Sequence, residues 1–145
     1  MNESGVLEHF RRAMRDNDAD AMRAGIELLL GLSSGVGLSA EEEFAVRHPD
    51  YVMDLPQSGE RIRGREAMRS MQEAFPTPPS IALRRVVGYG PVWVIEGVND
   101  YDGDVWRVVL ILELDDQGRI LRDTRYYAQT SEPAEWRSQW VDALE

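Results

Sequence analysis

The strongest constraint on the fold is a run of four strand-like segments between residues 80 and 129. Their sequences, rich in β-branched and aromatic residues, are IALRRVVGYG, PVWVIEGVND, DVWRVVLILEL and RILRDTRYYAQ. Turn-forming residues separate them at Gly90-Pro91, at 101–104 and at 115–118. Because such short turns join antiparallel neighbours, the sequence predicts a meander of antiparallel hairpins.

The first half of the chain has the spacing of amphipathic helices. Apolar residues recur at intervals of three and four over residues 3–16 and 65–75. Between them, a second helix is expected to begin at Asp18 and to end at the break over residues 33–37.

Shorter elements complete this prediction. Ser39 and Glu42 predict a capping box for a short helix that ends at or before His48, and residues 51–55 have the pattern of a strand. A last helix is expected to open at residues 131–133, with apolar positions at Trp136, Trp140, Val141 and Leu144. Helices followed by consecutive long strands indicate an α+β fold, in which helices cover one face of a curved antiparallel sheet and a pocket lies between them.

Composition narrows the class of protein and of partner. The 145 residues suit a single domain over 1–145, and the formal charge of −10 disfavours nucleic acid and an acidic membrane surface as partners. Without cysteine, and with two histidines that lack ligand spacing, we expect neither a metal nor an organic cofactor. The start lacks a signal-peptide pattern and the apolar stretch 26–32 is far shorter than a membrane helix, so we expect a cytoplasmic protein.

One predicted strand is apolar on both faces. One face carries Trp106, Val108, Leu110, Leu112 and Leu114, and the other carries Val105, Val109 and Ile111. A strand of this kind is covered on both sides. We therefore expect helices on one side and a second subunit on the other, which is a homodimer through the outer face of the sheet.

Three longer phrases carry a family resemblance: HPDYVMDLPQSGERIRGREAM, VWVIEGVND and GRILRDTRYYAQTSEPAEW. In combination they resemble the SnoaL-like branch of the nuclear-transport-factor-2-like (NTF2-like) superfamily, which includes relatives of polyketide cyclases. The resemblance covers most of the chain, and residues 24–38 look like extra material. It implies a strongly bent sheet wrapped about a long helix, with an apolar central cavity and often a homodimer. Fold alone does not set the activity.

Two chemistries of that superfamily are not supported by the residues. The hydrogen-bond donors of the steroid isomerases fall at Phe10 and near Leu110, which cannot donate, and the base position falls at or beside Leu55. The Arg and two Asp of the limonene-epoxide-hydrolase relatives fall on Gly97, Asn99 and Arg125.

The requirements of the SnoaL-like cyclases, an acid/base and a polar anchor, can be met. Asp123, Arg125 and Tyr127 alternate along one strand and so share a face. The resemblance puts this face, with Asp54 and Asn99, on the concave side. We hypothesise that Asp123 is the general acid/base, that Arg125 orients it or holds a substrate oxygen, and that Asp54 assists.

A wider set of residues is expected to contact the substrate, and each has an alternative role. The set is Asn99, Tyr127, Trp93, His48, Phe10 and Met14. If their face points outward, Asp123 and Arg125 would be only a solvent-exposed ion pair on one strand. Asp54 and Asn99 could instead stabilise turns, and His48 could cap a helix. The large apolar side chains are more often core.

Two classes of function follow. The first is an enzyme that cyclises, isomerises or hydrates a small, apolar, oxygenated molecule without a cofactor. The second is a protein of the same fold that binds a ligand, or forms a dimeric scaffold, without catalysis.

Overall fold

The computed structural model describes residues 5–32, 35–75 and 78–144. The helices are α1 (Gly5–Asp16), α2 (Ala19–Leu30), α3 (Ala40–Val46) and α4 (Arg65–Ala74), with a 3-10 helix η1 (Glu135–Trp140). The strands are β1 (Arg47–Leu55), β2 (Glu60–Arg63), β3 (Ser80–Tyr89), β4 (Val92–Tyr101), β5 (Asp104–Leu114) and β6 (Ile120–Gln129).

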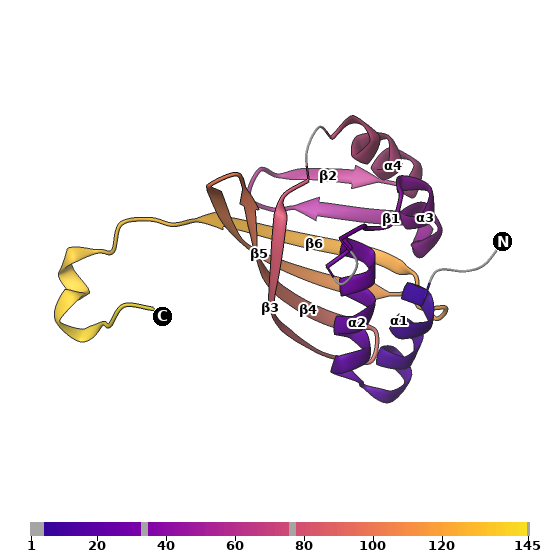
Figure 1. Ribbon diagram of the computed structural model, residues 1–145, viewed down its shortest axis with the longest axis horizontal. Coiled ribbons are helices and arrows are strands. Elements are labelled where there is room, and N and C mark those ends of the chain that lie inside the picture. The colour runs from indigo at the N-terminus through magenta and orange to yellow at the C-terminus, as the bar shows by residue number, and fades with distance from the viewer. Residues whose placement is uncertain (1–4, 33–34, 76–77, 145) are drawn as a thin grey trace.

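The strands form one curved, open sheet with the order β2-β1-β6-β5-β4-β3 (Figure 1). Every neighbouring pair is antiparallel except β1 and β6, which are parallel. The predicted α+β class and the predicted meander over β3 to β6 are therefore confirmed. The sheet as a whole is mixed, because β1 lies beside β6, the last strand of the chain, and runs parallel to it.

Local chemistry explains where the helices begin and end. The Asp18 side chain accepts a hydrogen bond from the Ala21 backbone N–H at the start of α2, and Gly31 ends that helix at φ +73°. The capping box of Ser39 and Glu42 is present at the start of α3, as predicted. Residues 3, 4, 33, 34, 76 and 77, which belonged to the predicted helix ends and breaks, lie outside the described residues.

Three elements differ from the prediction. Strand β1 begins at Arg47 rather than residue 51, and a register shift between Arg47 and Val52 accommodates Pro49. Strand β2 was not predicted, since its sequence ERIR has a single apolar residue. The last helix is confined to η1, a 3-10 helix in which the described part of the chain buries no residue.

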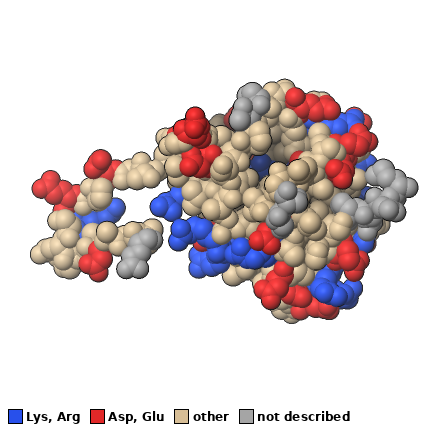
Figure 2. Space-filling view, viewed as in Figure 1, with Lys and Arg blue, Asp and Glu red and all other residues tan. Residues whose placement is uncertain are grey.

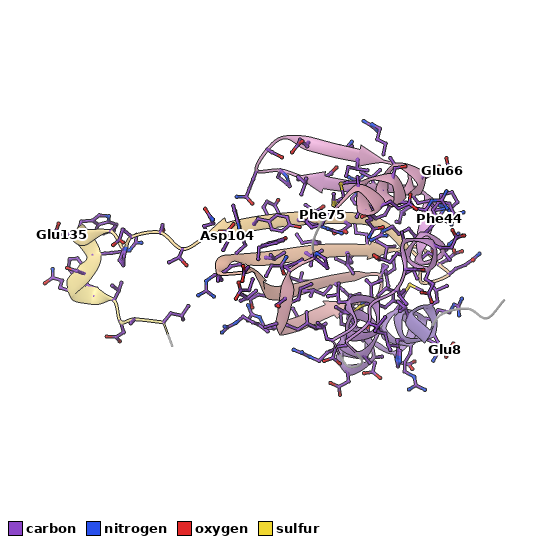
Figure 3. All side chains as sticks on the ribbon, turned by 45° about the horizontal axis from the view of Figure 1, so that its top comes forward. Glu8, Phe44, Glu66, Phe75, Asp104 and Glu135 are labelled. Atoms are coloured by element: carbon purple, nitrogen blue, oxygen red, sulfur yellow. The ribbon has the colours of Figure 1, made fainter. Side chains whose placement is uncertain are left out.

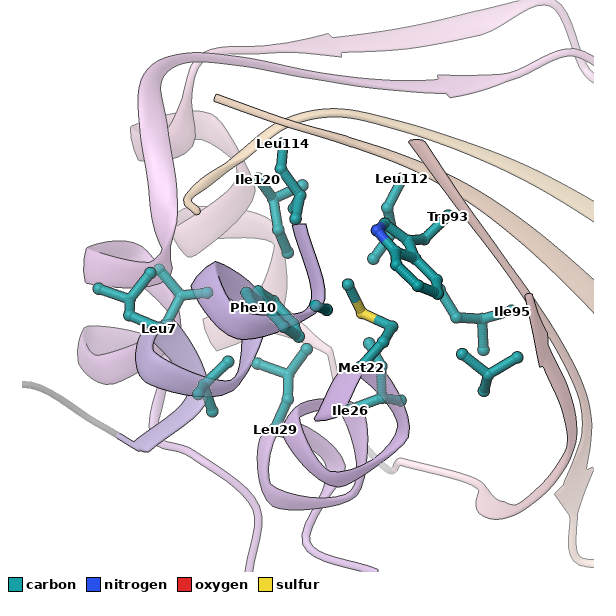
Figure 4. Close-up of a cluster of buried hydrophobic side chains, with 14 of the residues drawn as sticks. Leu7, Phe10, Met22, Ile26, Leu29, Trp93, Ile95, Leu112, Leu114 and Ile120 are labelled. Carbon is teal, nitrogen blue, oxygen red and sulfur yellow. The ribbon is translucent and has the colours of Figure 1, made fainter. Parts of the chain in front are cut away.

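The core lies between the first two helices and the inner face of the sheet (Figure 4). Phe10 of α1 and Met22 of α2 are completely buried against Trp93 and Ile95 of β4. The two helices approach closely at Gly25, where an added Cβ would lie 2.7 Å from the Phe10 ring. Residues 24–30, expected as extra material, are the second half of α2, and Ile26 and Leu29 belong to this core.

The side chains on the outer face of the sheet are less buried than those on the inner face. Strand alternation puts Val94, Val98, Val109 and Ile111 on this face, where they are only partly buried, and Tyr126 is 44% exposed. The buried side chains of the described helices belong to the core on the inner face. Within the described ranges, no helix is long and apolar enough to cross a membrane.

Candidate functional site

The centre of the candidate site is the Asp123 carboxylate on the inner face of β6. Its cross-strand neighbours are Leu112 on β5 and Met53 on β1, and the residue is 1% exposed. Oδ2 accepts a hydrogen bond from the Tyr51 hydroxyl at 3.0 Å and two from Arg125, at 3.0 Å from Nε and 2.7 Å from Nη2. Oδ1 is also buried, and it has no hydrogen-bond partner among the described residues. An acceptor in this state is unusual in a folded protein.

Burial and charge determine the protonation states of this cluster. Burial raises the pKa of Tyr51, and the negative charge of Asp123 raises it further, so the hydroxyl stays protonated and donates. Burial alone would lower the pKa of Arg125, but attraction to Asp123 outweighs it and the pKa is raised well above its usual value. The cluster is therefore a neutral phenol and a guanidinium that share one carboxylate oxygen.

A pocket of about 650 Å³, open to the surface, includes Arg125 of this cluster in its lining. Arg125 and Tyr127 line it from β6, together with Leu55, Gln57, Ser58, Phe75, Tyr101, Asp104 and Trp106. Most of these side chains are apolar or aromatic, and the volume is that of an ordinary small-molecule site. Figure 2 shows a hollow in the molecular face, with arginine atoms at its floor. Asp123 lies behind Arg125 and is not among the described lining residues.

Asp54 does not lie on the concave side as we expected. It pairs in register with Thr124 of β6, which in turn pairs with Ile111, so Asp54 belongs to the outer face. Its carboxylate accepts hydrogen bonds from Arg61 and Arg122 there. The hydrogen bond from Arg61 holds the pKa of Asp54 below its usual value. Asp54 is thus an ion-pair partner on the opposite face from Asp123 and takes no part in the site.

The other predicted contacts divide between the pocket wall and the core. Tyr127 lines the pocket, and Asn99 is on the inner face beside it, where Nδ2 donates to the Tyr101 hydroxyl at 3.4 Å. Phe10 and Trp93 are fully buried in the core, and Met14 packs against it.

His48 also lies apart from the pocket. It is in β1, where its Nδ1 accepts the backbone N–H of Asp50 at 2.9 Å. The helix cap that we considered for it is taken by Arg47.

Sequence reasoning missed Tyr51 and the polar group beside it. The Arg47 guanidinium lies 5.1 Å from the centre of the Tyr51 ring and contacts Glu43 at 3.1 Å and Gln72 at 3.3 Å. The available signal was the alternation of Tyr51 and Met53, which puts both on one face. It could not be used without knowing that β1 lies beside β6.

No cluster of His, Asp or Glu suited to hold a metal ion occurs within residues 5–32, 35–75 and 78–144. The polar residues that line the pocket are Arg125, with the Asp123 carboxylate behind it, and Gln57, Ser58, Tyr101, Asp104 and Tyr127.

Comparisons with known proteins show where this fold occurs elsewhere. No protein-family model matches the sequence, and no curated protein matches it. An NTF2-like protein of unknown function from Burkholderia xenovorans is similar, with a TM-score of 0.71 and 27% identity over 98% of this chain and 100% of that chain. A putative ketosteroid isomerase from Kribbella flavida has a TM-score of 0.71 and 24% identity, over 94% of this chain and 90% of its own.

A third similar structure is an LEH-like epoxide hydrolase from M. tuberculosis. Its TM-score is 0.52 and its identity 19%, over 85% of this chain and 80% of its own. At these identities the isomerase and the hydrolase show a shared fold, and their names describe those proteins alone.

Proposed function

Since the chain belongs by its fold to the NTF2-like superfamily, we propose that it is an isomerase- or hydrolase-type enzyme that takes a small, apolar, oxygenated molecule into the pocket at Arg125. The observation that carries this proposal is a charged guanidinium, held by a buried carboxylate, in the lining of a mostly apolar pocket. A contribution to stability does not by itself explain the Asp123–Arg125 pair, because a buried ion pair contributes little net stability compared with apolar residues of similar volume.

In this proposal, Arg125 binds an oxygen of the substrate. Its Nε and Nη2 are engaged by Asp123, and among the described residues its Nη1 has no hydrogen-bond partner. A fixed positive donor in an apolar pocket stabilises the negative charge that develops on a carbonyl or epoxide oxygen. The aromatic walls at Trp106 and Tyr127 would hold the apolar part of the same molecule.

Asp123 is proposed as the group that moves the proton. Among the described residues its Oδ1 has no hydrogen-bond partner, while Oδ2 is held by Tyr51 and Arg125, so we assign the two oxygens separate roles. A proton on the substrate would have to come within hydrogen-bond reach of Oδ1, past the Arg125 side chain. The steroid-isomerase route is not part of the proposal, because Phe10 and Leu110 occupy the positions we assigned to its donors.

The alternative is a protein that binds a ligand and does not convert it. The complete burial of Asp123 favours this alternative, because a carboxylate that only fixes Arg125 needs no access to the pocket. The two proposals share the ligand class and differ in turnover.

Binding can be tested by a thermal-shift screen at pH 6 and pH 8 against lipophilic ketones, lactones, epoxides and polyketide-like aromatics. A ligand at 100 times its dissociation constant adds about 2.7 kcal/mol to the free energy of unfolding, which raises the melting temperature measurably. We expect Arg125→Lys, which leaves a charge beside Asp123, to weaken the shift. The matched control is Arg122→Lys on the outer face of the same strand, which should leave it unchanged. The binding site is misplaced if both variants bind a hit as the unaltered protein does, and no hit at all contradicts the proposal.

Catalysis can be tested on each compound that binds, by following its conversion with Asp123→Asn as the variant. Loss of a general acid/base should lower turnover about 100-fold or more while the thermal shift by the compound persists. Full turnover by Asp123→Asn would exclude the proposed proton transfer. Binding without any conversion by the unaltered protein would favour the alternative.

A further inference from the structure

The segment after β6 carries large apolar side chains away from the rest of the molecule. We call residues 130–144 the C-terminal arm. Figures 1 and 3 show it standing clear of the helices and the sheet, with η1 and Glu135 far from the body. Trp136 is 75% exposed, Trp140 is 70% exposed and Leu144 is 81% exposed. Contiguous apolar exposure of this kind marks an interaction surface, because each tryptophan can bury 150 to 250 Å² on docking.

A second unpartnered surface lies on the outer face of the sheet. It is a hollow of about 330 Å³ whose lining includes Arg84, Glu96, Arg107, Val109 and Tyr126. Around it, the partly buried valines of β4 and β5 continue the apolar face on which no described helix packs. The hollow is therefore suited to an aromatic side chain with acidic residues beside it.

Charge supports the match between the two surfaces. Although the chain as a whole is strongly acidic, the hollow has two arginines, and Arg84 and Arg107 have no ion-pair partner in the described part of the chain. Glu96, the acidic residue of the hollow, is engaged by Arg85 at 3.4 Å. The arm contains Glu132, Glu135 and Asp142 against the single basic residue Arg137.

The geometry of the arm favours a hollow on another molecule. Ala128, which lines the chain's own hollow, is only two residues before the arm begins. A return to it would require the chain to reverse within residues 130–133, where Pro133 fixes its own φ and keeps Glu132 extended. Figure 1 shows the arm running on in the direction of β6.

We propose that the C-terminal arm of one copy docks in the outer-face hollow of a second copy, with the tryptophans of η1 on its apolar floor and Glu132 and Glu135 facing Arg84 and Arg107. By two-fold symmetry, the second arm occupies the first hollow. The arm thereby covers the outer face from which the sequence predicts a homodimer, and adds a defined contact to it.

The test is the mass in solution, by light scattering at micromolar concentration, of the full chain and of five variants, one of which is a control. The full chain is expected to be a dimer. Truncation after Gln129 and the pair Trp136→Ser with Trp140→Ser should each raise the dimer dissociation constant by at least about tenfold. Arg107→Glu should do the same, and combination with Glu135→Arg should restore part of the affinity. Arg12→Glu, an exposed arginine of α1, is the matched control and should have no effect.

Several results would overturn the proposal. They are a monomeric full chain, a dimer that survives truncation with its affinity unchanged, or a failure of Glu135→Arg to rescue Arg107→Glu. A monomer that loses thermal stability on truncation would place the arm on its own chain instead. Circular dichroism of each variant verifies that a lower mass does not reflect unfolding.

Discussion

At the scale of single residues, two groups of ion pairs lie on opposite faces of neighbouring strands and differ in their burial. Asp123 and Arg125 face the core, and their side chains are 2% and 20% exposed. The Asp54 partners Arg61 and Arg122 are both 40% exposed on the other face. Exposed pairs of this kind contribute about 0 to 1 kcal/mol, whereas loss of one partner from a buried pair costs about 3 to 5 kcal/mol. The test variant Arg125→Lys therefore keeps a positive charge.

A pH-dependent contribution to stability is expected from Asp115, in the turn between β5 and β6. Burial alone would raise the pKa of Asp115, but hydrogen bonds from Arg119 and Gln117 outweigh it and hold the pKa below its usual value. Because the folded state favours the charged form, this stabilisation is present above the unfolded pKa of about 4 and is lost as the pH falls through the lower folded value.

The variant Asp115→Asn should therefore reduce the free energy of unfolding by about 1 kcal/mol at pH 7 and by progressively less as the pH falls below about 4. Urea denaturation at a series of pH values measures this difference. Asp116→Asn, an exposed neighbour in the same turn, is the control. A deficit of Asp115→Asn that stays constant down to the lowest pH would show that its charge is not responsible.

At the scale of elements, the packing of α1 on α2 depends on the absence of a side chain at Gly25. A Cβ there would lie 2.7 Å and 2.8 Å from two carbons of the Phe10 ring, and Phe10 is fully buried and so has little room to move. Alanine is intrinsically better than glycine in a helix by about 1 kcal/mol, but overpacking a core costs about 1 to 3 kcal/mol. The steric cost should prevail.

We therefore expect Gly25→Ala to lower the free energy of unfolding by up to about 2 kcal/mol, the difference between these two effects. The matched control is Gly5→Ala in α1, whose added Cβ would be in ordinary contact with Leu28 at 3.4 Å and should be neutral or slightly stabilising. Denaturant unfolding of both variants measures the effect. A more stable Gly25→Ala would mean that the two helices can separate without cost.

At the scale of the whole molecule, one core joins the helices to the sheet, and the arm lies outside it. The core cluster includes residues of α1, α2, α4 and β1 as well as of the long strands. Elements that share a single core unfold together in most domains of this size.

We expect a single cooperative transition for the body, the same by far-ultraviolet circular dichroism and by tryptophan fluorescence. The fluorescence is best read in the variant Trp136→Ser with Trp140→Ser, in which the buried Trp93 and the partly buried Trp106 remain as reporters. Two separated transitions would contradict a single domain.

The sequence by itself determined the order of the elements apart from β2, the meander and most of the helix ends. These depend on interactions within a few residues, such as the Asp18 cap, the box of Ser39 and Glu42, and the turns of the hairpins. It also determined that Asp123, Arg125 and Tyr127 share a face, because alternation along one regular strand needs no knowledge of its neighbours.

Only the tertiary structure decided which face is which, and what lies across from it. The pairing of β1 with β6 puts Met53 opposite Asp123 and Asp54 opposite Thr124, so Asp54 lies on the outer face, and a one-residue difference in register would invert every side chain of the strand. The contact between Tyr51 and Asp123 joins residues 72 positions apart, through a parallel pairing that no local pattern encodes. For the arm, the apolar spacing predicted a helix, whereas the structure has a 3-10 helix without a buried residue, because burial depends on tertiary contacts that local spacing does not encode.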